Sequence, residues 1–427
     1  MNYKVSENCK SRTLEVSTFE EIVSLIKNGH NLLVVKMNLS KEELDKILSL
    51  ENEICLSSEL KFLIAHVYDS VLPVEKRDYQ KSFNIYEKLL EENYVPAYCK
   101  MGILYYAGFY VSMDRQKAVS YFEKGATQGD SHAQRWMGLC YYLGEGVVSN
   151  HKQAVYWYEQ AAKQGHADAL CDLAYCYGYG KGVEQDEEKS YKLYCLAAEQ
   201  AHAKAEYNVG STYERGDGVE QDYNKAFYWY EKAAKQGEAK AQCNLGHCYE
   251  CGLGVAENIE LAFYWYQKSA LQGYVLAQYN VGNCYIIGRG VKEDYEKAVY
   301  WYQKAANQGD ANAQCNLGNC YEKGRGVAKS YAHAMYWYAK SAEQEYPLAC
   351  YNLGVMYEYG KGIGKNYKEA YNWYQTAASL GVKEAIKAVA EYNQNKCPHC
   401  GSFYCFSEYR RANVVAYLRC NNCGKRK

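Results

Sequence analysis

The feature that most constrains this chain is a glycine that returns every 36 residues, without a single insertion or deletion. The glycine, replaced once by alanine, stands at Gly102, Gly138, Ala174, Gly210, Gly246, Gly282, Gly318 and Gly354. A period of this size, held across residues 95–382 of 427, is typical of one supersecondary unit stacked on copies of itself. The repeat therefore predicts one long solenoid with short non-repeating pieces at its two ends.

The composition is that of an ordered protein. Four prolines and 48% hydrophobic residues argue against a disordered or collagen-like chain, and a net charge of −1 gives the whole molecule no preference for anionic partners. The first twenty residues lack the apolar core of a signal peptide, and no stretch approaches the ~18 apolar residues of a membrane-spanning helix. We therefore expect a cytoplasmic protein, with the nucleus as an alternative, and no membrane association. In a reducing compartment the nineteen cysteines would be thiols or metal ligands.

Each repeat predicts two helices joined by a loop. In the copy over residues 239–274, the segment AKAQCNLGHCYEC places apolar residues at helical spacing and predicts helix A. In the G-L-G-V loop that follows, the first glycine suits the left-handed position after a helix, and the second permits close backbone approach. A short polar residue then predicts the N-cap of helix B. These N-cap residues are Asp114, Asn150, Asp186, Asp222, Asn258, Asp294, Ser330 and Asn366.

Helix B carries the expected buried stripe. Over residues 223–236, Ala226, Tyr230 and Ala233 share one helical face, and a glycine closes the helix in most copies. The glycine inside helix A costs about 1 kcal/mol of helix propensity relative to alanine. Its recurrence therefore predicts that helix B of a neighbouring repeat lies too close for a side chain.

The consensus A-x-x-x-L-G-x-x-Y-x-x-G-x-G-V, followed by K-A and W-Y-x-K-A-A-x-x-G, resembles the Sel1-like repeat family. Members of this family are relatives of tetratricopeptide repeats with a longer loop between the two helices. The resemblance covers eight consecutive copies over residues 95–382. It implies an all-α fold, a right-handed α/α superhelical solenoid, that acts as a non-enzymatic scaffold for protein partners.

The pieces outside the eight copies have patterns of their own. Residues 59–94 look like a degenerate capping repeat, and residues 383–395 predict a closing helix. Residues 1–58 form an N-terminal extension of unknown type with an α/β-like pattern. The elements expected in this extension are helices over 18–28 and 41–50 and a strand over 31–37.

The cysteines inside the repeats favour packing over chemistry. Some Sel1-like proteins are secreted and carry disulfides in phase with the repeat. Here Cys243 and Cys248 lie about 140° apart around one helix, and no cysteine recurs near the end of helix B to pair with them. We expect buried thiols that fill the contact between helices, with a redox role as the alternative.

The surface of helix A is the expected binding site. By analogy with tetratricopeptide repeats, helix A lines the concave face, and tyrosine is enriched at interfaces. The alternative is that these tyrosines belong to the core and that the asparagines Asn208, Asn244, Asn280, Asn316 and Asn352 bond neighbouring helices. The residues predicted to bind a partner protein are Tyr175, Tyr207, His247, Tyr279, Asn283, Asn319 and Tyr351.

The tail, residues 396–427, carries a metal-binding pattern. Two C-x-x-C motifs are separated by nineteen residues, in which 403–410 and 413–419 alternate enough to form a hairpin. This is the spacing of a four-cysteine zinc ribbon, and a redox C-x-x-C would need a thioredoxin-like context that the sequence lacks. We therefore expect one structural Zn²⁺ bound by Cys397, Cys400, Cys420 and Cys423.

The tail is also basic and rich in tyrosine, which is the pattern of a nucleic-acid-binding surface. Contact residues would be Arg410, Arg411 and Arg419. Such ribbons also bind proteins or close the end of a domain, so this function remains an alternative to the scaffold. A third hypothesis, a hydrolase of the Sel1-like family, has no support in the sequence: the histidines are scattered, and neither H-E-x-x-H nor G-x-S-x-G occurs. We expect no catalytic residues.

Overall fold

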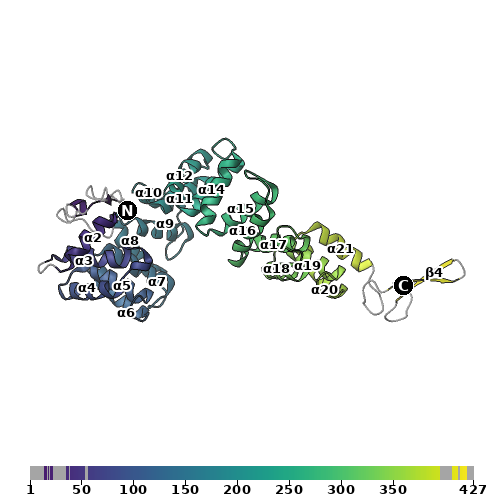
Figure 1. Cartoon of the computed structure of the whole chain (residues 1–427), viewed down its shortest axis with the longest axis horizontal. Helices are drawn as coiled ribbons and strands as arrows, with labels where there is room; N and C mark the ends of the chain where they lie inside the picture. Colours follow the sequence, from purple (N-terminus) through teal and green to yellow (C-terminus); the bar gives the residue numbers. More distant parts are fainter. Residues whose placement is uncertain are drawn as a thin grey trace. The chain divides into compact units, whose positions relative to one another are not determined.

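The computed structural model consists mainly of helix pairs joined by short loops, labelled in chain order in Figure 1. It describes residues 14–16, 18, 20–22, 35–37, 39–52, 56–394, 406–411 and 414–420. The chain divides into two compact units, an N-terminal unit (Met1–Glu238) and a C-terminal unit (Ala239–Lys427).

The N-terminal unit begins with short elements. Strands β1 (Leu14–Val16) and β2 (Val35–Met37) pair in parallel, so the strand expected over 31–37 is present in its described part. The helix expected over 41–50 is confirmed as α2 (Lys41–Ser49). Of the helix expected over 18–28, residues 20–22 are helical and 23–28 lie outside the described residues. The next elements are η3 (Leu50–Asn52), α3 (Ser58–His66), the π-helical turn η4 (Val67–Val71), η5 (Val74–Lys76) and α4 (Tyr79–Glu91).

Four repeats complete this unit, each with a helix A and a helix B. They are α5 (Val95–Ala107) and α6 (Arg115–Thr127), α7 (Ser131–Leu143) and α8 (His151–Lys163), α9 (Ala167–Tyr179) and α10 (Glu187–Ala198), and α11 (Ala203–Arg215) and α12 (Tyr223–Lys235). Within this unit, each helix packs against its partner in the repeat, and helix B of one repeat packs against helix A of the next, as α6 does against α7, α8 against α9 and α10 against α11. The buried residues form successive hydrophobic clusters along the repeats, and the partly buried Tyr105 and Tyr141 each pack against two neighbouring clusters.

The C-terminal unit contains the other four repeats in the same order. They are α13 (Ala239–Cys251) and α14 (Ile259–Leu271), α15 (Val275–Ile287) and α16 (Tyr295–Asn307), α17 (Ala311–Lys323) and α18 (Tyr331–Ala342), and α19 (Pro347–Tyr359) and α20 (Tyr367–Ser379). The predicted closing helix is α21 (Lys383–Gln394), and β3 (Phe406–Arg411) pairs with β4 (Val414–Cys420) as an antiparallel hairpin. The all-α solenoid predicted from the period is confirmed. No described helix combines the length and apolar character needed to cross a lipid bilayer.

The predicted ends of the helices are confirmed. All eight predicted N-cap side chains accept a backbone hydrogen bond from the first turn of helix B, as Asp222 does from Lys225 at 3.0 Å. The first loop glycine is left-handed, with φ of 76° at Gly144. A Cβ atom on the second, Gly146, would overlap the carbonyl oxygen of Arg115 in the preceding repeat. The second loop glycine therefore lets the loop lie against the backbone of the preceding repeat of the same unit, as at Gly146, Gly182, Gly218, Gly290, Gly326 and Gly362.

The predicted partner of the helix A glycine was wrong. A Cβ atom on Gly246 would lie 2.8 Å from the ring of Tyr266, which belongs to helix B of the same repeat and not to a neighbour. The cause is the tight packing of the two helices, in which the tyrosine ring lies across the glycine. The equivalent Tyr230 is fully buried, which confirms the predicted stripe of helix B. In the one repeat with alanine, Ala174, the corresponding Tyr194 is only partly buried.

Neighbouring repeats are also joined by glutamines that the sequence reasoning missed. Gln308, before the closing glycine of its repeat, donates to the carbonyl of Gly273 (3.1 Å) and to the side chain of Gln278 (2.8 Å). Gln164 and Gln344 make the equivalent pairs of bonds. The sequence contains a pattern that could have predicted these bonds, because a glutamine occupies the position before the closing residue in seven of the eight copies. These bonds satisfy backbone carbonyls at the end of the preceding helix B.

Most repeat cysteines are buried, as expected; the exceptions among those described are Cys195, which is partly buried, and Cys251, which is exposed. Cys243 and Cys248 are buried free thiols, and burial raises the pKa of Cys243 to about 12. The amide of Asn280 in the next helix A donates to the sulfur of Cys243 at 3.9 Å, and Asn352 makes the equivalent bond to Cys315 at 3.8 Å. Asn280 and Asn352 therefore bond neighbouring helices, and the alternative is confirmed for these two asparagines.

Candidate functional site

The buried tyrosine of helix B meets a carboxylate of helix A in four repeats. The hydroxyl group of Tyr266 donates to Glu250 at 2.6 Å, and that of Tyr338 donates to Glu322 at 3.0 Å. Tyr374 with Glu358 and Tyr230 with Glu214 form the same pair. Burial, and next the hydrogen bond to Glu250, raises the pKa of Tyr266 far above that of a free phenol. Each pair places a carboxylate at the surface of helix A.

In two repeats the same carboxylate also holds a cation from the following repeat. Arg289 Nη1 lies 3.0 Å from Glu250 Oε1, and Lys361 Nζ lies 2.7 Å from Glu322 Oε1. Both cations occupy the middle position of a Gly-x-Gly loop, 39 residues after their carboxylate. Hydrogen bonding to His247, with Tyr266 and Arg289 contributing, lowers the pKa of Glu250. We call this arrangement the carboxylate bridge.

The repeat between these two lacks the carboxylate. Ile286 in α15 stands where Glu250 and Glu322 stand in α13 and α17. Without that acceptor, the hydroxyl group of Tyr302 donates to Asn283 Oδ1 at 2.7 Å. The amide group of Asn316 completes the cluster, 3.3 Å from the Tyr302 oxygen and 3.4 Å from Asn283 Oδ1. An uncharged network thus replaces the carboxylate bridge.

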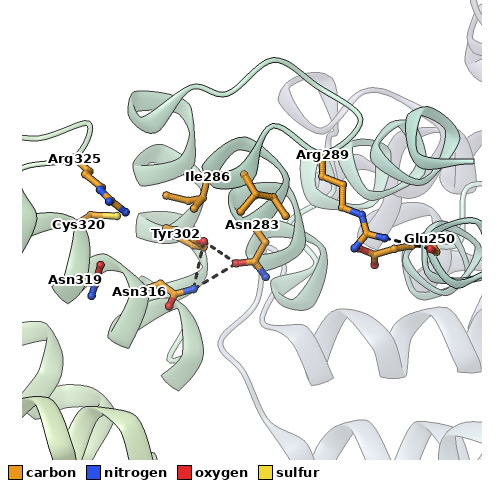
Figure 2. A pocket seen from close by; sticks show the side chains of 10 residues that line it. Glu250, Asn283, Ile286, Arg289, Tyr302, Asn316, Asn319, Cys320 and Arg325 are labelled. Atoms are coloured by element: carbon orange, nitrogen blue, oxygen red, sulfur yellow. Dashed lines mark hydrogen bonds and ion pairs between the residues drawn. The ribbon is translucent and has the colours of Figure 1, made fainter.

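A pocket of about 340 Å³ lies at this repeat (Figure 2). Its wall combines apolar side chains, amides and two guanidinium groups. The lining residues are Glu250, Asn283, Ile286, Ile287, Arg289, Tyr302, Asn316, Asn319, Cys320 and Arg325. In Figure 2, Arg289 is joined to Glu250, whereas Arg325 extends from its loop toward Cys320 with no such partner. In the part of the chain that the structure describes, no carboxylate lies within ion-pair distance of Arg325.

The predicted partner-binding residues fall into different environments. Asn283 and Asn319 line the pocket, and His247 is exposed on α13. Tyr175, in the N-terminal unit, is 42% exposed. The tyrosines that alternate along helix A are partly buried and pack on the buried tyrosine of helix B, with ring centroids 5.8 Å apart for Tyr207 and Tyr230, 6.1 Å for Tyr279 and Tyr302, and 5.6 Å for Tyr351 and Tyr374. These three support the core and offer one edge to solvent.

Helix B carries an exposed aromatic stripe that the sequence reasoning did not single out. Tyr264, Tyr300 and Tyr336 are 44%, 53% and 53% exposed, and each lies against the tryptophan that follows it. Lys304 lies over Tyr300, with Nζ 4.7 Å from the ring centroid. The repeated W-Y motif predicts the buried tyrosine. The tyrosine before the tryptophan recurs with the same 36-residue period and forms the exposed stripe.

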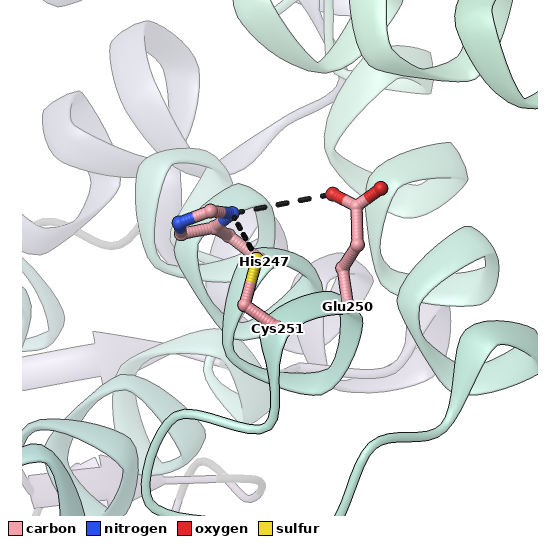
Figure 3. A group of neighbouring side chains, drawn as sticks. All are labelled: His247, Glu250 and Cys251. Carbon is pink, nitrogen blue, oxygen red and sulfur yellow. Dashed lines mark hydrogen bonds and ion pairs between the residues drawn. The ribbon is translucent and has the colours of Figure 1, made fainter.

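Three side chains on α13 could offer ligands to a metal ion (Figure 3). His247, Glu250 and Cys251 follow each other at helical spacing, and their ligand atoms lie within 4.8 Å of one another. Cys251 Sγ is 3.6 Å from His247 Nδ1, and Glu250 Oε2 is 4.0 Å from the same nitrogen. Glu250 already accepts from Tyr266 and pairs with Arg289, so a metal ion would have to share this carboxylate.

The residues predicted for the tail are described only in part. The hairpin expected over 403–410 and 413–419 is confirmed as β3 and β4, with an irregularity between Tyr409 and Arg410. Arg410 and Arg411 lie in β3, and Arg419 lies in β4. Cys420 ends β4. The other predicted zinc ligands, Cys397, Cys400 and Cys423, lie outside the described residues.

Repeated helix pairs, linked by Gly-x-Gly loops and presenting polar side chains along helix A, define a helical repeat solenoid of the kind that fits a protein-interaction scaffold. The Sel1 repeat model matches eight consecutive segments, residues 95–130, 131–166, 167–202, 203–238, 239–274, 275–310, 311–346 and 347–382. Because these segments cover more than half of the sequence, the chain belongs to the Sel1 repeat family.

Solved structures with similar folds include other proteins of this kind. A Sel1 repeat protein from Oxalobacter formigenes is 28% identical, with alignment over 74% of this chain and 92% of that chain and a TM-score of 0.54. The protein c5321, a protective antigen of uropathogenic Escherichia coli strains displaying an SLR fold, is 28% identical over 88% of this chain and 91% of that chain, with a TM-score of 0.45. A comparison with proteins of curated function gave no significant match.

Proposed function

We propose that this protein is a non-enzymatic scaffold that binds partner proteins through side chains on the surface of helix A. The observation that carries the proposal is the contrast between a constant frame and a variable position beside it. The helix A glycine and the aromatic ring packed on it recur in most copies, while the residue after that glycine varies. From the third to the eighth copy it is Tyr175, Ser211, His247, Asn283, Asn319 and Val355, of which Ser211 is buried and the other five are exposed or partly exposed. Such variation suits a surface that makes a different contact at each step.

The proposal is tested by capturing partners with the intact chain and with two surface variants. Tyr175→Ser combined with His247→Ser changes two exposed helix A side chains, one in each unit. The matched control is Tyr228→Ser combined with Tyr300→Ser, which changes two exposed helix B tyrosines. We expect partners to be lost with the first variant and kept with the second. The reverse result would move the binding surface to the helix B stripe and refute the proposal.

We also propose that the tail binds one structural zinc ion through Cys397, Cys400, Cys420 and Cys423. Support comes from the C-x-x-C spacing and from the antiparallel hairpin between the two motifs, which ends at Cys420. Four thiolates would close the coordination sphere, and the ion would hold the ends of the hairpin together.

Nucleic-acid binding by the tail stays a prediction. It rests on Arg410, Arg411 and Arg419, which stand on two paired strands. A gel shift by the intact protein that weakens with salt and is lost on changing these arginines to glutamine would support it. Unchanged mobility at low salt would remove this alternative. A cytoplasmic location likewise stays a prediction.

A further inference from the structure

The C-terminal unit has three junctions between consecutive repeats; the first and third share one arrangement, and the middle one lacks it. In the first and third, a helix A carboxylate accepts from the buried tyrosine of its own repeat and pairs with the loop cation of the next. The distances are 2.6 Å and 3.0 Å around Glu250, and 3.0 Å and 2.7 Å around Glu322. In the middle junction the loop cation is present as Arg325, but Ile286 replaces the carboxylate.

This single replacement leaves donors without a charged acceptor. The hydroxyl group of Tyr302 bonds to Asn283 and accepts from Asn316, so the phenol is satisfied without a carboxylate. Arg325 is exposed, and its guanidinium carbon lies 5.6 Å from the centroid of the Tyr295 ring. An isoleucine side chain accepts no hydrogen bond, and the space beside it is open as the pocket of Figure 2.

The charge of the lining favours one singly charged anion. The pocket is lined by two guanidinium groups and one carboxylate, and Arg289 is neutralised by Glu250 at 3.0 Å. One positive charge therefore remains. A guanidinium group forms two parallel hydrogen bonds with a carboxylate, which is the strongest pairing open to it. Phosphate carries more charge than one free cation can neutralise, so the lining suits a carboxylate better.

The size and the apolar wall favour a side chain over a complete small molecule. A volume of about 340 Å³ is at the lower end of the range for small-molecule pockets. Ile286 and Ile287 provide an apolar surface for methylene groups, while Arg325 and Asn319 provide polar groups on the wall formed by the next repeat. A glutamate side chain combines a short apolar stem with a terminal carboxylate and matches both surfaces.

We propose that the pocket beside Ile286 binds a carboxylate group of a partner protein, which takes the place held by Glu250 and Glu322 in the flanking repeats. The inference rests on the proposed scaffold function and specifies the chemistry of one contact. Arg325 binds the carboxylate oxygens, and Asn319 lies in the same lining, where its amide group can contribute a further donor. The carboxylate is that of a glutamate side chain, whose methylene groups match the apolar wall of Ile286 and Ile287.

The test uses the intact protein, labelled with ¹³C at the isoleucine δ1 methyl groups, because Ile286 and Ile287 line the pocket. The probes are N-acetyl-glutamate N-methylamide, its glutamine counterpart and N-acetyl-leucine with a free carboxylate. We expect the methyl signals of both isoleucines to shift with the glutamate probe and not with the glutamine probe. A response to N-acetyl-leucine alone would assign the site to a terminal carboxylate and overturn the choice of a glutamate side chain. Equal responses to glutamate and glutamine, or none to any probe, would overturn the proposal.

Two variants locate the binding group. Arg325→Gln should weaken the response to the carboxylate probe about tenfold or more, since it removes the free cation. The matched control, Lys361→Gln, removes a loop cation that is already paired with Glu322 and should leave the response unchanged. Ile286→Glu should supply the missing carboxylate from within the chain and abolish the shift of Ile287. Undiminished binding by Ile286→Glu would contradict the proposal.

The outcome for the pocket is separable from the outcome for the scaffold. Partner capture that survives Arg325→Gln but is lost on changing Tyr175 and His247 would refute the pocket and leave the scaffold in place. Capture that survives both changes would refute the scaffold as well. Capture lost with Arg325→Gln and kept with Lys361→Gln would support the two proposals together.

Discussion

Lys361 Nζ lies 2.7 Å from Glu322 Oε1, so a loop of one repeat is tied to helix A of the repeat before it. The same carboxylate accepts the hydroxyl hydrogen of Tyr338, whose ring lies across Gly318. A single glutamate therefore joins both helices of its own repeat to the next repeat. The carboxylate bridge depends on the position of the Tyr338 ring. A side chain at Gly318 would push this ring, and with it the hydroxyl group, away from Glu322.

Gly246→Ala should destabilise the repeat formed by α13 and α14. The new Cβ atom would lie 2.8 Å from the Tyr266 ring, which must shift and carry its hydroxyl group away from Glu250. We expect a loss of about 1–3 kcal/mol, measured by hydrogen exchange of the two helices. Gly364→Ala is the control, since a Cβ atom there meets no atom within 4 Å and should change stability by less than ~0.5 kcal/mol. Equal protection in the two variants would contradict this packing.

Glu345→Gly should stabilise the protein. Glu345 and Ala201 close their helices with φ of 57°, where six other repeats use glycine. A side chain in this left-handed conformation costs about 1 kcal/mol, and the gain from glycine is partly offset by the greater freedom of the unfolded chain. We expect a net gain of roughly 0.5–1 kcal/mol in a denaturant titration. Gly381→Ala, at φ of 89°, should produce a change of opposite sign. Destabilisation by Glu345→Gly would show that the side chain has a compensating role.

The parts of this fold that depend on short-range chemistry could be predicted from the sequence. An N-cap such as Asp222 needs only its own side chain and the next turn, so its role follows from local order. The partner of Gly246 depends on how two helices pack, and the period alone does not distinguish the same repeat from a neighbour. The pocket was missed for a related reason. Ile286 differs from its counterparts in one copy, and its meaning depends on a contact with a loop in the next repeat.

Acid should destabilise the N-terminal unit through two paired histidines. His166 Nδ1 accepts from the backbone of Ala169, so the proton is on Nε2, which lies 3.1 Å from His132 Nδ1. Burial lowers the pKa of His132 to about 3 and that of His166 to about 4. Both remain neutral in the fold at pH 5, whereas the unfolded chain takes up protons below about 6.5. The two histidines therefore cost the fold nothing above pH 6.5. As the pH falls below that value, the free energy of unfolding decreases by about 1.4 kcal/mol per pH unit for each histidine.

Hydrogen exchange of α7 and α9 at pH 7 and pH 5 measures this effect. His166→Asn keeps an N-cap side chain and should remove about half of the pH dependence. His333→Asn changes an exposed histidine of the C-terminal unit and should leave it intact. Equal pH dependence in all three proteins would assign the acid sensitivity to other groups.

Zinc content should decide between two groups of ligands in the chain. Four thiolates of the tail can close a tetrahedral site, whereas the cluster on α13 offers one thiolate, one imidazole and a carboxylate already engaged by Tyr266 and Arg289. We therefore expect about one zinc ion per purified chain by elemental analysis. The double change Cys397→Ser and Cys400→Ser should remove the metal, and Cys251→Ser should not. If zinc instead disappeared with Cys251→Ser and persisted in the tail variant, the site would be His247, Glu250 and Cys251, and the tail would have to hold its hairpin without a metal.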